Sequence, residues 1–177
     1  LRFPGAAPPH PILARLPGGR SVESSSPGDP VSCVSLFVHH ERPEAAVVAN
    51  ELHKRLADGG HDVRLPTVDA EIAGLEALAC DEAAITAGGL DLAIAIGGDG
   101  TILRTVSLVA AAGTAVLGVN VGQLGYLSEV EPDDAVAALD KVLAGDFEIE
   151  ERMQVRVQIE RDGTPDGAAH DAVAVGM

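Results

Sequence analysis

The residues best suited to chemistry are an aspartate and the glycines around it, in the segment Gly97-Gly98-Asp99-Gly100-Thr101. Glycines let a backbone turn tightly and present its N–H groups to an anion, and a helix starting there adds its own amides. Arg104 follows at helical spacing and could contact a bound phosphate. A carboxylate would repel that phosphate, so Asp99 would instead accept a proton from an attacking hydroxyl or hold a divalent metal. A plain strand–turn–helix capped by Asp99 is the alternative.

A second glycine-rich segment follows the next predicted strand and reads Gly118-Val119-Asn120-Val121-Gly122-Gln123-Leu124-Gly125-Tyr126-Leu127. Parallel sheets covered by helices bind their ligands at the carboxyl edge, so we expect both segments to meet there. The residues Asn120, Gly122 and Gly125 would shape this second loop. Tyr126 could stack on a flat ring such as adenine, or it could simply cover the core.

The elements that must position these segments alternate between strand and helix. Apolar runs predict buried strands over 31–38, 62–65, 90–96 and 115–119. Amphipathic spacing predicts helices over 43–58, 101–112 and 132–143. Residues 66–88 are predicted to hold a loop and a short helix over 70–79. This alternation is typical of an α/β fold with a Rossmann-like parallel sheet flanked by helices.

The two ends of the chain differ from this pattern. Residues 1–30 carry seven prolines and a serine run and are predicted to be a disordered leader. Residues 31–147 would form the α/β nucleotide-binding domain. Apolar and polar residues then alternate over 153–160, which predicts an antiparallel strand, with a returning strand over 172–175. Residues 148–177 are therefore expected to be the start of a truncated, β-rich second domain.

Composition excludes several classes of protein. The net charge is −15, from 12 basic and 27 acidic residues, which disfavours nucleic acid and anionic membranes as partners. The uncharged stretch 105–128 is long enough to span a bilayer, but its glycines and Asn120 favour a buried helix, turn and strand. Cys33 and Cys80 match no metal spacing, and we predict no metal bound by the chain's own side chains.

Together, the motifs Gly-Gly-Asp-Gly-Thr-x-x-Arg and Gly-x-Asn-x-Gly-x-Leu-Gly-Tyr-Leu resemble those of the NAD kinase family. The family transfers a phosphoryl group, usually from ATP, to the 2′-hydroxyl of the adenosine ribose of NAD. The resemblance thus implies NAD and ATP as substrates, a divalent cation such as Mg²⁺, formation of NADP and a cytoplasmic location. Full-length relatives are homo-oligomers, and the state of this chain is left open.

The resemblance also implies roles for individual residues. Asp99 matches the general base and, with Gly100, contacts NAD. The other matches to the NAD site are Arg104, Tyr126, Asp171 and His170, where His170 stands in place of the family's asparagine. Backbone contacts to phosphate would fall on Gly97, Gly98, Gly100 and Thr101.

Two other functions stay open at this point. A catalytically impaired remnant of this family would bind nucleotide without forming NADP. The truncated second domain and His170 motivate this alternative. A diacylglycerol-type lipid kinase shares the first motif, but we expect it to lack the second.

Overall fold

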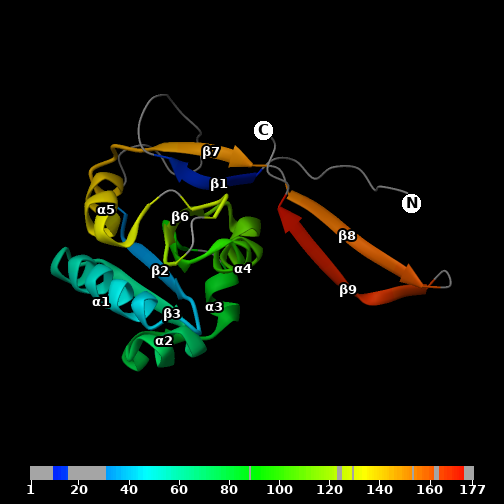
Figure 1. Cartoon of the computed structure of the whole chain (residues 1–177), viewed down its shortest axis with the longest axis horizontal. Helices are drawn as coiled ribbons and strands as arrows, with labels where there is room; N and C mark the ends of the chain where they lie inside the picture. Colours follow the sequence, from blue (N-terminus) through cyan, green and yellow to red (C-terminus); the bar gives the residue numbers. More distant parts are fainter. Residues whose placement is uncertain are drawn as a thin grey trace.

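The computed structural model describes residues 10–15, 31–87, 89–122, 125–128, 130–152, 154–161 and 164–173, with side chains described only between 31 and 152. Within these ranges a five-stranded sheet has the order β4-β3-β2-β5-β6, and all of its strands run parallel. Its strands are β2 (Cys33–Val38), β3 (Asp62–Pro66), β4 (Ala79–Cys80), β5 (Leu92–Gly97) and β6 (Ala115–Asn120). Helices cover both faces of this sheet (Figure 1), which confirms the predicted α/β fold.

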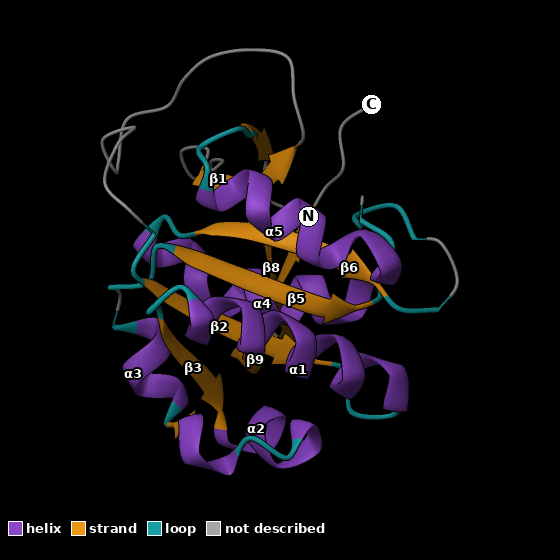
Figure 2. Ribbon diagram, turned by 90° about the vertical axis from the view of Figure 1, so that its left-hand side faces the viewer, coloured by secondary structure: helices purple, strands orange, loops and turns teal. Residues whose placement is uncertain are grey.

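One face of the sheet packs against α1 (Pro43–Asp58), α2 (Thr67–Ala73) and α5 (Ala135–Leu143). The opposite face packs against α3 (Glu82–Thr86) and α4 (Asp99–Val109). Every residue of β2 and β5 is buried, as expected for central strands that are covered on both sides. Figure 2 shows these helices stacked on either side of the strands. The sheet therefore holds the ends of β2, β5 and β6 in a fixed register.

The segment 66–88 is where the predicted elements are wrong. A helix over 70–79 was expected, but α2 already ends at Ala73, because Gly74 adopts a left-handed conformation with φ of 68°. A 3₁₀ turn (Glu76–Leu78), the short strand β4 and the helix α3 follow. Elements this short carry too few residues to show a hydrophobic period.

The helix after the first glycine motif also differs from its prediction. It was expected over 101–112, but α4 begins at Asp99 and ends at Val109, and a 3₁₀ turn (Ala110–Ala112) follows. Asp99 is thus the first residue of the helix, and Gly98 precedes it as the N-cap.

Antiparallel strands lie outside the parallel sheet. Strand β1 (His10–Arg15), inside the segment predicted as a leader, pairs with β7 (Glu148–Arg152). Strands β8 (Gln154–Arg161) and β9 (Thr164–Val173) form a hairpin, in which β9 replaces the shorter returning strand predicted over 172–175. Figure 1 shows the hairpin beside the α/β part of the chain. No helix among the described residues is long and apolar enough to cross a membrane.

Candidate active site at the carboxyl edge of the sheet

The two glycine-rich motifs meet at the carboxyl ends of β5 and β6. Gly97 and Asn120 are paired in register as the last residues of these neighbouring strands. The Val121 amide donates to the Gly97 carbonyl at 3.0 Å, which keeps the two chain segments together beyond the strands. The structure thus brings together the two loops that the sequence placed at one edge.

Asp99 forms the main contact between the motifs. Its Oδ2 accepts the Tyr126 amide and its Oδ1 accepts the Leu127 amide, each at 3.0 Å. Gly125 makes this approach possible, because a Cβ at that position would overlap the Asp99 carboxylate. A carboxylate has about four lone-pair positions. Two hydrogen bonds leave it able to accept a further proton donor, such as a substrate hydroxyl.

The turn before α4 is shaped for close approach of the backbone. A Cβ on Gly97 would overlap the side chain of Thr101, which is itself 8 % exposed. A Cβ on Gly98 or Gly100 would meet open space, so their backbones face room in which a ligand could lie. No side chain among the described residues caps α4 at Gly98. The Thr101 amide donates to the Gly98 carbonyl at 3.0 Å, which leaves the amides of Asp99 and Gly100 without a partner among the described residues. These two amides remain able to bind an anion, whereas the predicted phosphate contact of the Thr101 amide does not fit this geometry.

The second loop contains the predicted Asn120, Gly122 and Tyr126. Asn120 is 1 % exposed, and its Oδ1 has no hydrogen-bond partner among the described residues. Gly122 has a φ of 119°, and a Cβ there would overlap the guanidinium of Arg42. Tyr126 is 90 % exposed, so it does not cover the core, and its ring is accessible to a ligand.

Arg104 lies in a different arrangement from the one its spacing suggested. Its Nη1 and Nη2 donate to the two oxygens of Asp69 at 3.0 and 2.7 Å, and Nη2 also lies 3.4 Å from Glu82. The hydrogen bonds to Asp69 raise the pKa of the Arg104 guanidinium above its ordinary value. In this structure the fork of Arg104 contacts a carboxylate and not the glycine turn.

Asp69 is the residue of this region that the sequence analysis missed. It is fully buried, and its Oδ1 also accepts the Val38 amide at 2.6 Å. A signal was available, because Asp69 shares the spacing of Ala70 and Ala73, which are buried on the same short helix. A carboxylate at a buried helical position requires a partner.

His39 follows β2 at the same edge of the sheet. Its amide donates to the Ile96 carbonyl at 3.0 Å, and its ring stacks on that of His40 with centroids 5.1 Å apart. Burial, and then the neighbouring His40, lower the pKa of His39. The described residues contain no cluster of three or more His, Cys, Asp or Glu that could hold a metal ion.

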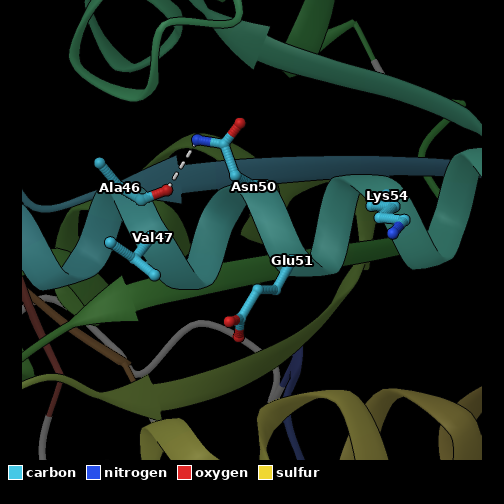
Figure 3. Close-up of a pocket in the computed structure, with 5 residues that line it drawn as sticks. All are labelled: Ala46, Val47, Asn50, Glu51 and Lys54. Atoms are coloured by element: carbon cyan, nitrogen blue, oxygen red, sulfur yellow. Dashed lines mark hydrogen bonds between the residues drawn. The ribbon is translucent and has the colours of Figure 1, made fainter.

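Two hollows mark the described surface, and one of them adjoins this edge. One, of about 440 Å³, includes Arg42, Val121 and Gly122 and so adjoins the second loop. The other, of about 490 Å³, is lined by one face of α1 (Figure 3). There the Asn50 side chain donates to the carbonyls of Ala46 and Ala73, both at 2.8 Å, so it links α1 to the end of α2. This second hollow contains no residue of either motif.

His170 and Asp171 lie in β9, where their backbones pair with Val157 and Arg156 of β8. Their side chains are outside the described part of the chain, and so is Gln123 of the second loop. Their predicted contacts with NAD stay predictions.

Residues 34–147 match the family model of the ATP-NAD kinase N-terminal domain. The chain belongs to the NAD kinase family. The match covers the parallel sheet from the second residue of β2 onward, together with both motifs, so it includes the edge at which Asp99 lies.

Curated relatives in this family are longer than the chain. It is 40 % identical over 129 residues to an NAD kinase of Symbiobacterium thermophilum, which covers 73 % of this chain and 45 % of the relative. It is 37 % identical over 136 residues to NAD kinase 2 of Streptomyces coelicolor, which covers 75 % of this chain and 45 % of that protein. The chain thus spans less than half the length of these relatives.

The fold is similar to that of a solved NADH kinase. The crystal structure of yeast NADH kinase in complex with NADH matches 92 % of this chain and 54 % of its own, with a TM-score of 0.65 and 19 % sequence identity. At this identity the likeness concerns the fold alone.

Proposed function

We propose that the chain carries the catalytic edge of an NAD kinase and transfers the terminal phosphoryl group of ATP to the 2′-hydroxyl of the adenosine ribose of NAD. The observation that carries the proposal is the contact between Asp99 and the amides of Tyr126 and Leu127, which joins both family motifs at one edge of the sheet. Relatives named NAD kinase at 33–40 % identity support this activity. A cytoplasmic location stays a prediction.

Phosphoryl transfer requires an oriented nucleophile, a held phosphate and an acceptor for the hydroxyl proton. Asp99 is the proposed acceptor, because its carboxylate lies at the carboxyl edge with lone pairs left beside its two amide bonds. The free amides at the start of α4 would hold phosphate oxygens. Tyr126, with 90 % of its surface exposed, would stack on the adenine.

The divalent cation of this reaction enters as part of the nucleotide substrate. The described residues offer no carboxylate cluster for a resident ion, and Mg²⁺ commonly binds through substrate phosphates and water. In a chain with a net charge of −15 the cation would also reduce repulsion of the nucleotide. We therefore assign it to Mg·ATP.

The test is NADP formation from NAD and Mg·ATP by the purified chain, beside Asp99→Asn and the matched variant Asp91→Asn. Asp91 also accepts two backbone amides, from Ser32 and Cys33, but at the amino end of β5. We expect Asp99→Asn to lower kcat by about 10²–10⁴-fold, the usual contribution of a general base. Asp91→Asn should leave kcat unchanged.

Two results would contradict the proposal. NAD binding by calorimetry without any NADP formation would instead identify a nucleotide-binding remnant. Phosphorylation of diacylglycerol but not of NAD would identify a lipid kinase.

A further inference from the structure

A fully buried carboxylate connects three elements at the edge that carries Asp99. Asp69 of α2 accepts the amide of Val38, the last residue of β2, at 2.6 Å. The same carboxylate receives both terminal nitrogens of Arg104, on α4, at 3.0 and 2.7 Å. We refer to Asp69, Arg104 and the Val38 amide as the Asp69 clamp. Each oxygen of the buried carboxylate therefore has a partner.

Two members of the Asp69 clamp are connected to the turn that carries Asp99, one through α4 and one through the end of β2. Arg104 lies on the same helix as Asp99, which is the first residue of α4. Directly after Val38, the His39 amide donates to the Ile96 carbonyl, next to Gly97. Rotation or sliding of α4 against β2 would thus separate Arg104 from a carboxylate that has no other cation at hydrogen-bond distance among the described residues. Such a bidentate pair restrains both distance and orientation.

From this geometry we infer that Asp69 and Arg104 are positioning residues, which set the orientation of α4 and hence the place of the Asp99 carboxylate. The inference rests on the proposed NAD kinase function and changes the part that Arg104 has in it. In this role Arg104 acts through its bidentate pair with Asp69.

The two roles for Arg104 predict different kinetics. A direct ligand of NAD, once removed, raises KM for NAD, and loss of the buried Asp69 would free the guanidinium for the nucleotide. A positioning pair lowers kcat when either partner is lost and leaves KM for NAD nearly unchanged, because misplacement of a reacting group acts on the chemical step. The second loss then adds little to the first.

The experiment is a double-mutant cycle with Asp69→Asn, Arg104→Gln and the double variant, measured as kcat and KM for NAD. We expect each single substitution to lower kcat by up to about 10²-fold, as for a small displacement of a catalytic group. The double variant should match the lower of the two. A raised KM with unchanged kcat in Arg104→Gln, or multiplicative losses in the double variant, would overturn the inference.

Amide hydrogen exchange provides a readout that needs no turnover. The Tyr126 and Leu127 amides are bound by Asp99, whereas the Ser32 and Cys33 amides are bound by Asp91 at the far end of β5. Asp69→Asn should speed exchange at Tyr126 and Leu127 and leave Ser32 and Cys33 protected. Equal acceleration at both pairs, or none at Tyr126 and Leu127, would refute positioning.

If the Asp69→Asn variant does not fold, the milder substitution Arg104→Lys provides the same test. Lysine keeps the charge but lacks the two-pronged fork, so exchange at Tyr126 and Leu127 should still accelerate. Absence of NADP formation by the unsubstituted chain would remove the proposed function alone, since the exchange pattern tests the Asp69 clamp by itself.

Discussion

Each end of strand β5 has an aspartate that accepts hydrogen bonds from two consecutive backbone amides. At the amino end, Oδ2 of Asp91 accepts the amides of Ser32 and Cys33 at 2.8 and 2.9 Å, and also the Ser32 hydroxyl at 3.0 Å. At the carboxyl end, Asp99 accepts the amides of Tyr126 and Leu127 with one oxygen each. The two carboxylates thus have nearly the same bonding pattern on opposite edges of one sheet.

Their surroundings separate a structural aspartate from a candidate catalytic one. Asp91 concentrates its bonds on a single oxygen and fastens the start of β2 to the start of β5. Asp99 begins a helix whose N-cap is glycine, and a Cβ on Gly98 or Gly100 would meet open space. Amide bonds alone therefore do not identify a site. Uncapped helix amides and open space above glycine backbones are what distinguish the carboxyl edge.

The largest expected difference between the two edges concerns their arginine–aspartate pairs. At the carboxyl edge Arg104 contacts Asp69, whose side chain is 0 % exposed, whereas at the amino end of β3 Arg64 contacts Asp62, whose side chain is 56 % exposed. Arg104→Met leaves a buried carboxylate without its cation. It should therefore lower the free energy of unfolding by about 3 kcal/mol, the low end of the range for buried pairs because Arg104 is itself partly exposed.

The matched variant is Arg64→Met, for which urea denaturation should show a loss of at most about 1 kcal/mol, as for exposed pairs. Equal losses in the two variants would show that burial of Asp69 does not set the strength of its pair. The contrast between the edges would then rest on the glycines alone.

Glycines at the two edges of the sheet differ in what a larger side chain would meet. Gly125 lies at the carboxyl edge, where there is no space for a side chain, because a Cβ would overlap the Asp99 carboxylate. Gly113, before the amino end of β6, has a φ of 72°, and a Cβ there would meet open space. Gly125→Ala should cost about 1–3 kcal/mol of stability, as for an overpacked position. Gly113→Asn should be nearly neutral, since asparagine tolerates the left-handed region.

Thermal unfolding of both variants beside the unsubstituted chain measures this difference. A neutral Gly125→Ala would mean that the second loop can move away from Asp99 at little cost. The amide bonds to Asp99 would then be no more specific to the site than those to Asp91.

The sequence predicted most of the sheet, because long apolar runs and amphipathic helices leave a clear period. Helix α1 has the predicted bounds, and β2, β3, β5 and β6 lie within two residues of theirs. The elements of 66–88 could not be predicted because each is too short for a period. Of these, α2 carries the buried Asp69, so the error there also hid the partner of Arg104.

The sequence predicted which residues form the candidate site, but not all of the contacts that their side chains make. Glycine spacing placed both motifs at one edge, and the structure brings them together through Asp99. Spacing also assigned Arg104 to a phosphate, since Arg104 follows Gly100 by four residues, about one helical turn, but helical spacing says nothing of a carboxylate on another element. The fork of Arg104 meets Asp69, which lies thirty-five positions earlier in the chain.

The smallest expected effect is a pH dependence that belongs to the carboxyl edge. Burial, and then the neighbouring His40, lower the pKa of His39 below the ordinary value of 6.5. Between the lowered pKa and 6.5 the unfolded chain binds more protons than the folded one, so stability rises with pH there. The contribution of His39 is complete above about pH 6.5 and is lost as pH falls through the folded pKa. Because the side chain is only partly buried, we expect the free energy of unfolding to change only slightly with pH.

Urea denaturation from pH 5 to 7.5 should show a weaker pH dependence of the free energy of unfolding in His39→Gln than in the unsubstituted chain. An identical slope in the two proteins would mean that His39 does not contribute to the pH dependence of stability in this range.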